Sequence, residues 1–104
     1  MFELEQTWES TGSTAALTAV QVPFPAMESV LYVEHSTLAT SNSFEFQTAQ
    51  QSSGPWFTEA STAMGATAVV AQRALRVTGP YRWMRPQLKT ASTGVYNLRL
   101  LVVR

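Results

Sequence analysis

The chain has 104 residues, no Cys, one His and equal numbers of acidic and basic side chains, so its formal net charge is zero. This length predicts a single domain, and a neutral chain is a poor candidate for a nucleic-acid binder that neutralises many phosphates. Without Cys there is neither a disulfide framework nor a thiolate metal site. No apolar run approaches the roughly 20 residues of a membrane helix, and Met1-Phe2-Glu3 does not open a signal peptide. We therefore expect a soluble, unprocessed chain that binds no membrane.

The charges are divided along the sequence. All the acidic residues are Glu and lie between Glu3 and Glu59, whereas all the basic residues lie between Arg73 and Arg104. If strands from the two halves pair, opposite charges will lie side by side. The alternative is a polar subunit that meets a complementary neighbour.

The first 28 residues predict strands joined by an extended connection. Phe2, Leu4 and Trp8 alternate with mostly acidic residues, which is typical of a strand or arm with one apolar face. Ala15 to Val22 predict a second strand. In Pro23-Phe24-Pro25 the two prolines withhold backbone donors, so this segment is expected to be an extended connection that leaves Phe24 available to dock.

Strand patterns continue through the middle of the chain. An Ala-rich segment, residues 59–74, is the one place where a helix competes, and Gly65, Val69 and Val70 within it favour strand or loop. We expect strands at Ser29–His35, at Ser43–Ala49, from Trp56 onward, near Ala66–Gln72 and at Ala74–Thr78.

The end of the chain predicts a hairpin. Gly79-Pro80 signals a turn, and Tyr81–Leu88 and Val95–Val103 then flank a short loop of small residues. Apolar residues fall on both faces of the last segment, so that strand is expected to be covered on both sides, with another subunit as one candidate cover.

The spacing of these segments predicts the fold class. About eight short strands separated by turn residues indicate an all-β, antiparallel sandwich or jelly roll made by residues 1–104 as one domain. Within it, residues 1–28 are either an extended arm and connection that reaches a neighbour or the strands that close the sandwich of their own chain.

Residues that would carry catalysis are scarce. The one His, His35, has no recognisable nucleophile motif beside it, and the spacing of the Glu residues selects no pair for glycoside hydrolysis. There is no Asp for a calcium loop, no Cys for zinc and no Gly-rich phosphate loop. We therefore predict a protein that is not an enzyme, with no catalytic residues, metal or cofactor.

The aromatic residues leave two interpretations open. Trp56, Tyr81 and Trp83 could form a flat platform for stacking sugars, with Arg82 or Arg85 binding hydroxyls, or they could be core, as aromatic residues in strands usually are. The alternation of Tyr81, Trp83 and Arg85 with their neighbours favours core, with the large rings pointing inward.

Two stretches carry a resemblance to a known class of proteins. Both lie within residues 43–104. The first, SFEFQTAQQSSGPWFTEA, contains an alternating aromatic strand followed by a Gly-containing turn. The second, VTGPYRWMRPQLKTASTGVYNLRLLVV, contains a later strand and a final hydrophobic strand. This pattern resembles the small β-sandwich structural proteins of tailed bacteriophages, of the capsid decoration or cement type. The turn at Ser53-Gly54-Pro55 has no acidic residue, which argues against a calcium ion there.

The resemblance implies a non-enzymatic virion protein on the capsid surface, assembled in the host cytoplasm. Its expected partners are the major capsid protein or other virion proteins and further copies of itself, a trimer being one arrangement, with no nucleic acid. The alternatives are a neck or tail protein and a carbohydrate-binding module. The residues expected to bind partners are Phe2, Leu4, Trp8, Phe24, Arg82 and Arg85.

Overall fold

The computed structural model describes residues 4–11, 14–35, 42–64, 71–89 and 95–104. These residues contain strands and connections but no helix, and hence no helix long and apolar enough to cross a membrane. The strands are β1 (Leu4–Ser10), β2 (Val20–Gln21), β3 (Glu28–His35), β4 (Asn42–Ala49), β5 (Phe57–Met64), β6 (Ala71–Thr78), β7 (Trp83–Leu88) and β8 (Tyr96–Val103).

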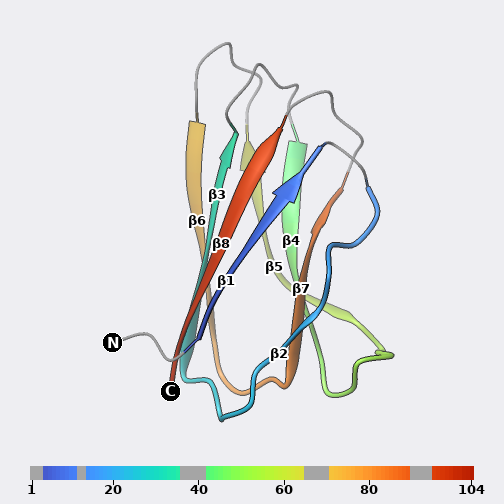
Figure 1. Ribbon diagram of the computed structural model, residues 1–104, viewed down its shortest axis with the longest axis vertical. Coiled ribbons are helices and arrows are strands. Elements are labelled where there is room, and N and C mark those ends of the chain that lie inside the picture. Colours follow the sequence, from blue (N-terminus) through green and yellow to red (C-terminus); the bar gives the residue numbers. More distant parts are fainter. Residues whose placement is uncertain (1–3, 12–13, 36–41, 65–70, 90–94) are drawn as a thin grey trace.

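The strands form two antiparallel sheets that face each other (Figure 1). Sheet A has the order β1-β8-β3-β6, and sheet B has the order β2-β7-β4-β5. The first strand therefore pairs with the last, the second with the seventh, the third with the sixth and the fourth with the fifth. This nested pairing is that of a jelly roll, so the predicted fold class is confirmed.

The predicted hairpin at the end of the chain is wrong. β7 lies in sheet B between β2 and β4, whereas β8 lies in sheet A between β1 and β3. A connection of this length is typical of a hairpin, but a connection of the same length can also bridge two sheets that are about 10 Å apart. Of the strands expected between residues 66 and 78, the structure has a single one, β6, and residues 65–70 lie outside the described part.

The amino-terminal segment lies in the sandwich of its own chain. β1 pairs with β8 from Leu4 opposite Val102 to Ser10 opposite Tyr96. The predicted second strand is much shorter than expected, because only Val20 and Gln21 pair with β7. Of the two interpretations of residues 1–28, closure of the same chain's sandwich is therefore the arrangement that the described residues have.

The open side of the sandwich is covered by the connection that precedes β2. The Leu17 amide donates to the Pro86 carbonyl at 3.1 Å, and the Trp8 indole Nε1 donates to the Thr18 carbonyl at 2.9 Å. These two bonds tie residues 14–19 to β7 in one sheet and to β1 in the other. This segment therefore bridges the sheets without forming a ladder.

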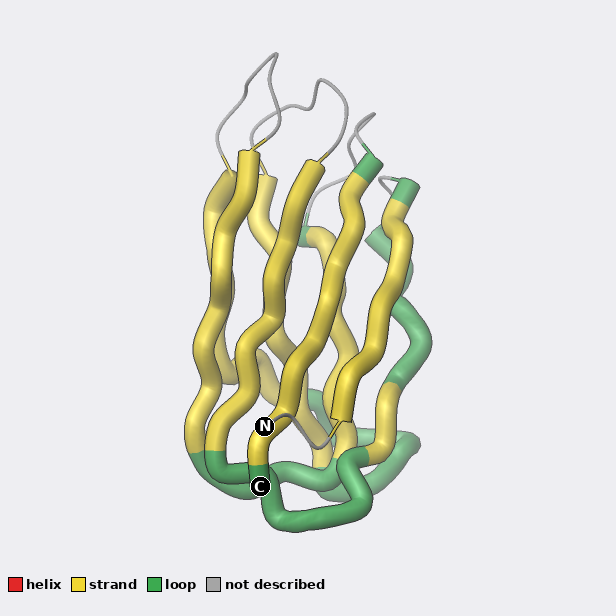
Figure 2. Tube along the Cα trace, turned by 60° about the vertical axis from the view of Figure 1, so that its left-hand side comes forward, coloured by secondary structure: helices red, strands yellow, loops and turns green. Residues whose placement is uncertain are grey.

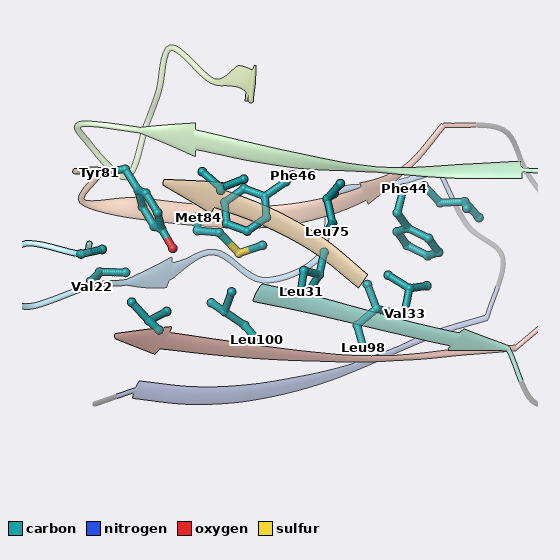
Figure 3. Packing of buried hydrophobic residues seen from close by; sticks show 14 of the residues in the cluster. Val22, Leu31, Val33, Phe44, Phe46, Leu75, Tyr81, Met84, Leu98 and Leu100 are labelled. Atoms are coloured by element: carbon teal, nitrogen blue, oxygen red, sulfur yellow. The ribbon is translucent and has the colours of Figure 1, made fainter. Parts of the chain in front are cut away.

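The core fills the space between the sheets (Figure 3). Leu31 and Leu100 of sheet A and Phe44, Phe46 and Met84 of sheet B are fully buried there. The rings meet edge to face, Phe44 against Tyr96 at 5.1 Å and Phe46 against Tyr81 at 5.7 Å between centroids, a favourable arrangement for aromatic pairs. These side chains occupy the interior, so recognition by this fold must occur on its outer surfaces.

The predicted orientation of β7 is wrong. Met84, Pro86 and Leu88 are buried, and Trp83 and Arg85 lie on the outer face of sheet B. Tyr81 does point inward, but it precedes the strand and follows the turn at Gly79, whose φ of +98° suits glycine. A bend at Arg82 separates Tyr81 from the strand, so alternation carried from Tyr81 into β7 assigns Trp83 and Arg85 to the wrong face.

Candidate functional site

Described loops gather at the end of the sandwich where β1 begins and β8 ends, which we call the basal end (Figure 2). It comprises Pro23–Met27, residues 50–56, Gly79–Arg82 and Arg104. Its segments are held by backbone bonds from the Val22 amide to the Arg82 carbonyl, 2.7 Å, and from the Met27 amide to the Val103 carbonyl, 2.8 Å. The basal end is therefore a braced surface although it contains no ladder.

The basal end combines exposed apolar groups with positive charge. Met27 is 69% exposed, the highest value among the large hydrophobic residues in the described part of the chain. Phe24 packs partly against the core, and the Arg104 guanidinium lies 5.1 Å from the centroid of its ring. A recess of about 500 Å³ beside Phe24 is also lined by Arg82. Two of the predicted partner-binding residues, Phe24 and Arg82, are thus brought together here.

The outer face of sheet B holds a polar network. The Arg85 guanidinium stacks on the Trp56 ring, 4.3 Å from its centroid, and its Nε donates to the Gln47 Oε1 at 2.8 Å. Gln47 in turn donates to Glu45 at 2.9 Å and to Gln87 at 2.8 Å. The hydrogen bond from Gln47 is the main cause that lowers the pKa of Glu45 below its usual value. Arg85, predicted to bind a partner, is therefore engaged by its own chain.

Gly54 sets the position of Trp56 in that network. Its φ is +87°, and a Cβ built on it would lie 2.8 Å from the Cδ1 of Trp56. Only glycine allows both the backbone conformation and this close approach. The Gly-containing turn noted in the sequence therefore places the ring on which Arg85 stacks.

Of the two interpretations of Trp56, Tyr81 and Trp83, the structure does not have the sugar platform. Tyr81 is buried, and its hydroxyl is hydrogen-bonded to the Ser29 hydroxyl between the sheets. Burial raises the pKa of Tyr81 to about 12, although the bond with Ser29 opposes that rise. Since one of the three rings is in the core, they cannot form a single surface.

The outer face of sheet A is hollowed into a groove of about 1,020 Å³, which we call the sheet A groove. Two rows of side chains cross all four strands there. The first row runs from Thr7 through Arg99 and Tyr32 to Ala74. Tyr32 is 43% exposed in the middle of this row.

The second row of the sheet A groove is entirely polar. It runs from Glu9 through Asn97 and Glu34 to Gln72. The Gln72 Nε2 donates to the Glu34 Oε2 at 2.9 Å. Sequence reasoning missed both rows, although the outward position of Tyr32 between the buried Leu31 and Val33 is a signal that period-two alternation contains.

Two ion pairs explain how the divided charges are arranged. Arg99 of β8 lies 2.6 Å from Glu5 of β1, and Arg76 of β6 lies 2.6 Å from Glu28 of β3. Each pair joins the acidic part of the sequence to the basic part across neighbouring strands, as the first of the two interpretations predicted. The pairs are exposed, so their contribution to stability is small.

The remaining predicted partner-binding residues lie elsewhere. Leu4 and Trp8 are partly buried against the core of their own chain, and Phe2 lies outside the described residues. Leu101 is 8% exposed beside Val30, which is 5% exposed, on the outer face of sheet A, so it needs no second subunit to cover it. Within the described ranges no three residues of the metal-ligating types His, Cys, Asp and Glu gather at one point.

No protein-family model and no curated protein matches this sequence. Solved structures do share the fold. PirA matches with a TM-score of 0.57 at 10% identity, over 95% of this chain and 93% of its own. The K2 cleaved adhesin domain of Lys-gingipain matches with a TM-score of 0.59 at 7% identity over 83% of this chain, which spans 61% of that domain.

A third similar structure comes from a phage genome. The SPBc2 prophage-derived protein YomS matches with a TM-score of 0.50 at 13% identity, over 99% of this chain and 98% of its own. At these identities the likenesses concern the fold alone. The chain is thus a small β-sandwich whose structural neighbours include an adhesin domain and a phage-derived protein.

Proposed function

We propose that the chain is a non-enzymatic virion structural protein that decorates a bacteriophage capsid, and that it binds the major capsid protein through the basal end. The observation that carries the proposal is the exposed Met27 on a segment braced by Pro23 and Pro25. An ordered surface loses little conformational entropy on binding, so this entropy cost offsets little of the free energy gained from the apolar contact. The shell surface that fits it is apolar and acidic, because Arg82 and Arg104 flank the site.

Two further observations support this proposal. The phage-like sequence pattern covers residues 43–104, and a prophage-derived protein of nearly the same extent has the same fold. The chain contributes its surface rather than a reaction, since its one His has no nucleophile motif beside it. A protein of the neck or tail would dock through the same contacts but would be present in a different number of copies per particle. We also propose that the chain self-associates into a homo-oligomer.

The test is cosedimentation with shells that lack this chain, together with mass spectrometry of intact particles. The expected result is saturable binding at a copy number that matches the shell lattice. Met27→Asp should weaken it at least about tenfold, because burying an unpaired carboxylate costs more than the ~1.4 kcal/mol that a factor of ten represents. Light scattering of the free protein measures its oligomeric state.

Tyr32→Ala is the matched control, since it also removes an exposed apolar side chain but from the sheet A groove. It should bind shells as the unchanged protein does. Docking through the basal end would be refuted if Met27→Asp, still folded, bound shells undiminished. A copy number of a few per particle would instead place the protein in the neck or tail.

A further inference from the structure

We propose that the sheet A groove is a binding site for a neutral oligosaccharide, with Tyr32 as the stacking ring. This inference does not rest on capsid decoration, because it concerns a different surface. The groove is built within one chain from all four strands of sheet A. Adjacent strands lie ~4.8 Å apart, so the two rows extend roughly 14 Å across the sheet, enough for a short oligosaccharide rather than a single small ion.

The hollow has a simple cause in side-chain size. Tyr32 stands between Arg99 on one side and Ala74 on the other, and the row ends in Thr7. Ala74 is short, so it leaves open the space on its side of the phenol ring, and Thr7 is short at the far end of the row. The ring therefore forms an apolar wall beside the polar second row.

The second row supplies groups suited to sugar hydroxyls. A hydroxyl both donates and accepts, and this row offers carboxylate acceptors in Glu9 and Glu34 and amides that do both in Asn97 and Gln72. The hydrogen bond from Gln72 to Glu34 fixes these two side chains relative to each other. An apolar ring beside convergent polar groups is the usual composition of a small-ligand site.

The charges of the groove disfavour an anionic ligand. Glu9, Glu34, Arg73 and Arg99 all line the groove. Arg99 is in addition paired with Glu5 at 2.6 Å. The groove therefore has no excess of positive charge that would attract a sulfated or sialylated glycan or a nucleic acid. A protein partner is disfavoured as well, because the centres of protein interfaces are depleted in charged residues and this groove is rich in them.

The experiment is a glycan microarray that carries neutral gluco-, galacto- and manno-oligosaccharides beside sulfated and sialylated ones, followed by calorimetry with the strongest neutral glycan. We expect binding to neutral glycans alone. Tyr32→Ala should reduce affinity at least tenfold with an unchanged melting temperature, whereas Tyr32→Phe should retain most of it because the ring face remains. Asn97→Ala should reduce binding severalfold.

Two controls separate this site from the other surfaces. Met27→Asp, at the basal end, should bind the glycan normally, and so should Trp83→Ala on the outer face of sheet B. The proposal is overturned if no neutral glycan binds, if only charged glycans bind, or if Tyr32→Ala leaves affinity unchanged. Met27→Asp tests docking to shells and Tyr32→Ala tests glycan binding, and each is the control for the other experiment, so failure of one proposal leaves the other standing.

Discussion

Deletion of residues 1–10 should unfold the protein. The deletion removes β1, which pairs with β8 over its whole length and brings Leu4 and Trp8 against the core. If the same residues were an arm for a neighbour, the shortened chain would stay folded and lose only its partner. The experiment therefore separates the two interpretations of this segment directly.

The magnitude follows from the contacts of β1. A large side chain contributes about 1.5–3 kcal/mol when fully buried, so two partly buried ones, Leu4 and Trp8, contribute roughly half of that each. The hydrogen bond from the Trp8 indole to the Thr18 carbonyl adds about 1 kcal/mol. The loss in the free energy of unfolding is therefore roughly 2.5–4 kcal/mol. This sum does not include the further cost of exposing the apolar face of β8. It is a large part of the 5–15 kcal/mol that stabilises an ordinary domain.

The assay is far-UV circular dichroism with urea denaturation of the full-length and shortened chains. We expect the shortened chain to lose its cooperative transition or to show a strongly lowered midpoint. Trp8→Phe is the finer perturbation, since it keeps a ring but removes the indole donor, and it should cost about 1 kcal/mol. A shortened chain with the β-sheet spectrum and midpoint of the full-length protein would refute the reasoning.

Two further perturbations test local features of the fold. Gly54→Ala should destabilise the protein by about 1–3 kcal/mol and shift Trp56 fluorescence, because it adds a clash to backbone strain. Gly79 has a similar φ, and no atom lies within 4 Å of the carbon that Gly79→Ala would add, so this control should lower the free energy of unfolding by less. Equal decreases for the two variants in urea denaturation would contradict the clash. The raised pKa of Tyr81, about 12, means that the unfolded chain ionises first, so its contribution to stability is present below about pH 10 and is lost as the pH rises toward 12. Tyr81→Phe should flatten this alkaline decline, measured by urea denaturation between pH 8 and 12, and an identical pH dependence would count against the assignment.

Much of the fold follows from local patterns in the sequence. The strands from Ser29 to His35 and from Ser43 to Ala49 were predicted to within a residue, because alternation there is uninterrupted and one face is buried. Ala15–Val22 was predicted as a strand, but its amide and carbonyl groups mostly go elsewhere: Leu17 bonds to Pro86 and only Val20 and Gln21 form a ladder. Extended backbone and a paired strand have the same sequence pattern.

Strand partners were harder to predict than strands. A hairpin between the last two strands agrees with every local signal, yet β7 and β8 lie in different sheets. The choice depends on what else each strand can bury against. β8 is apolar along one whole face and lies between β1 and β3, a central position that the jelly roll gives it and a terminal hairpin does not. Nesting of the first strand with the last is a global property that no short window contains.

The same property decides where recognition can occur. Glu9, Asn97 and Gln72 are far apart in the sequence, and period-two alternation shows only that each faces outward. The order β1-β8-β3-β6 places them in one row with Glu34, beside the row that holds Tyr32. If β7 and β8 formed a terminal hairpin, β8 would lie in sheet B beside β7. Asn97 would then be absent from sheet A, and the groove would not exist. A binding surface on this fold is therefore predicted by strand order rather than by a sequence motif. The aromatic residues that the sequence pattern singles out do not lie on this surface: Tyr81 is in the core, and Trp56 and Trp83 are on the sheet B side.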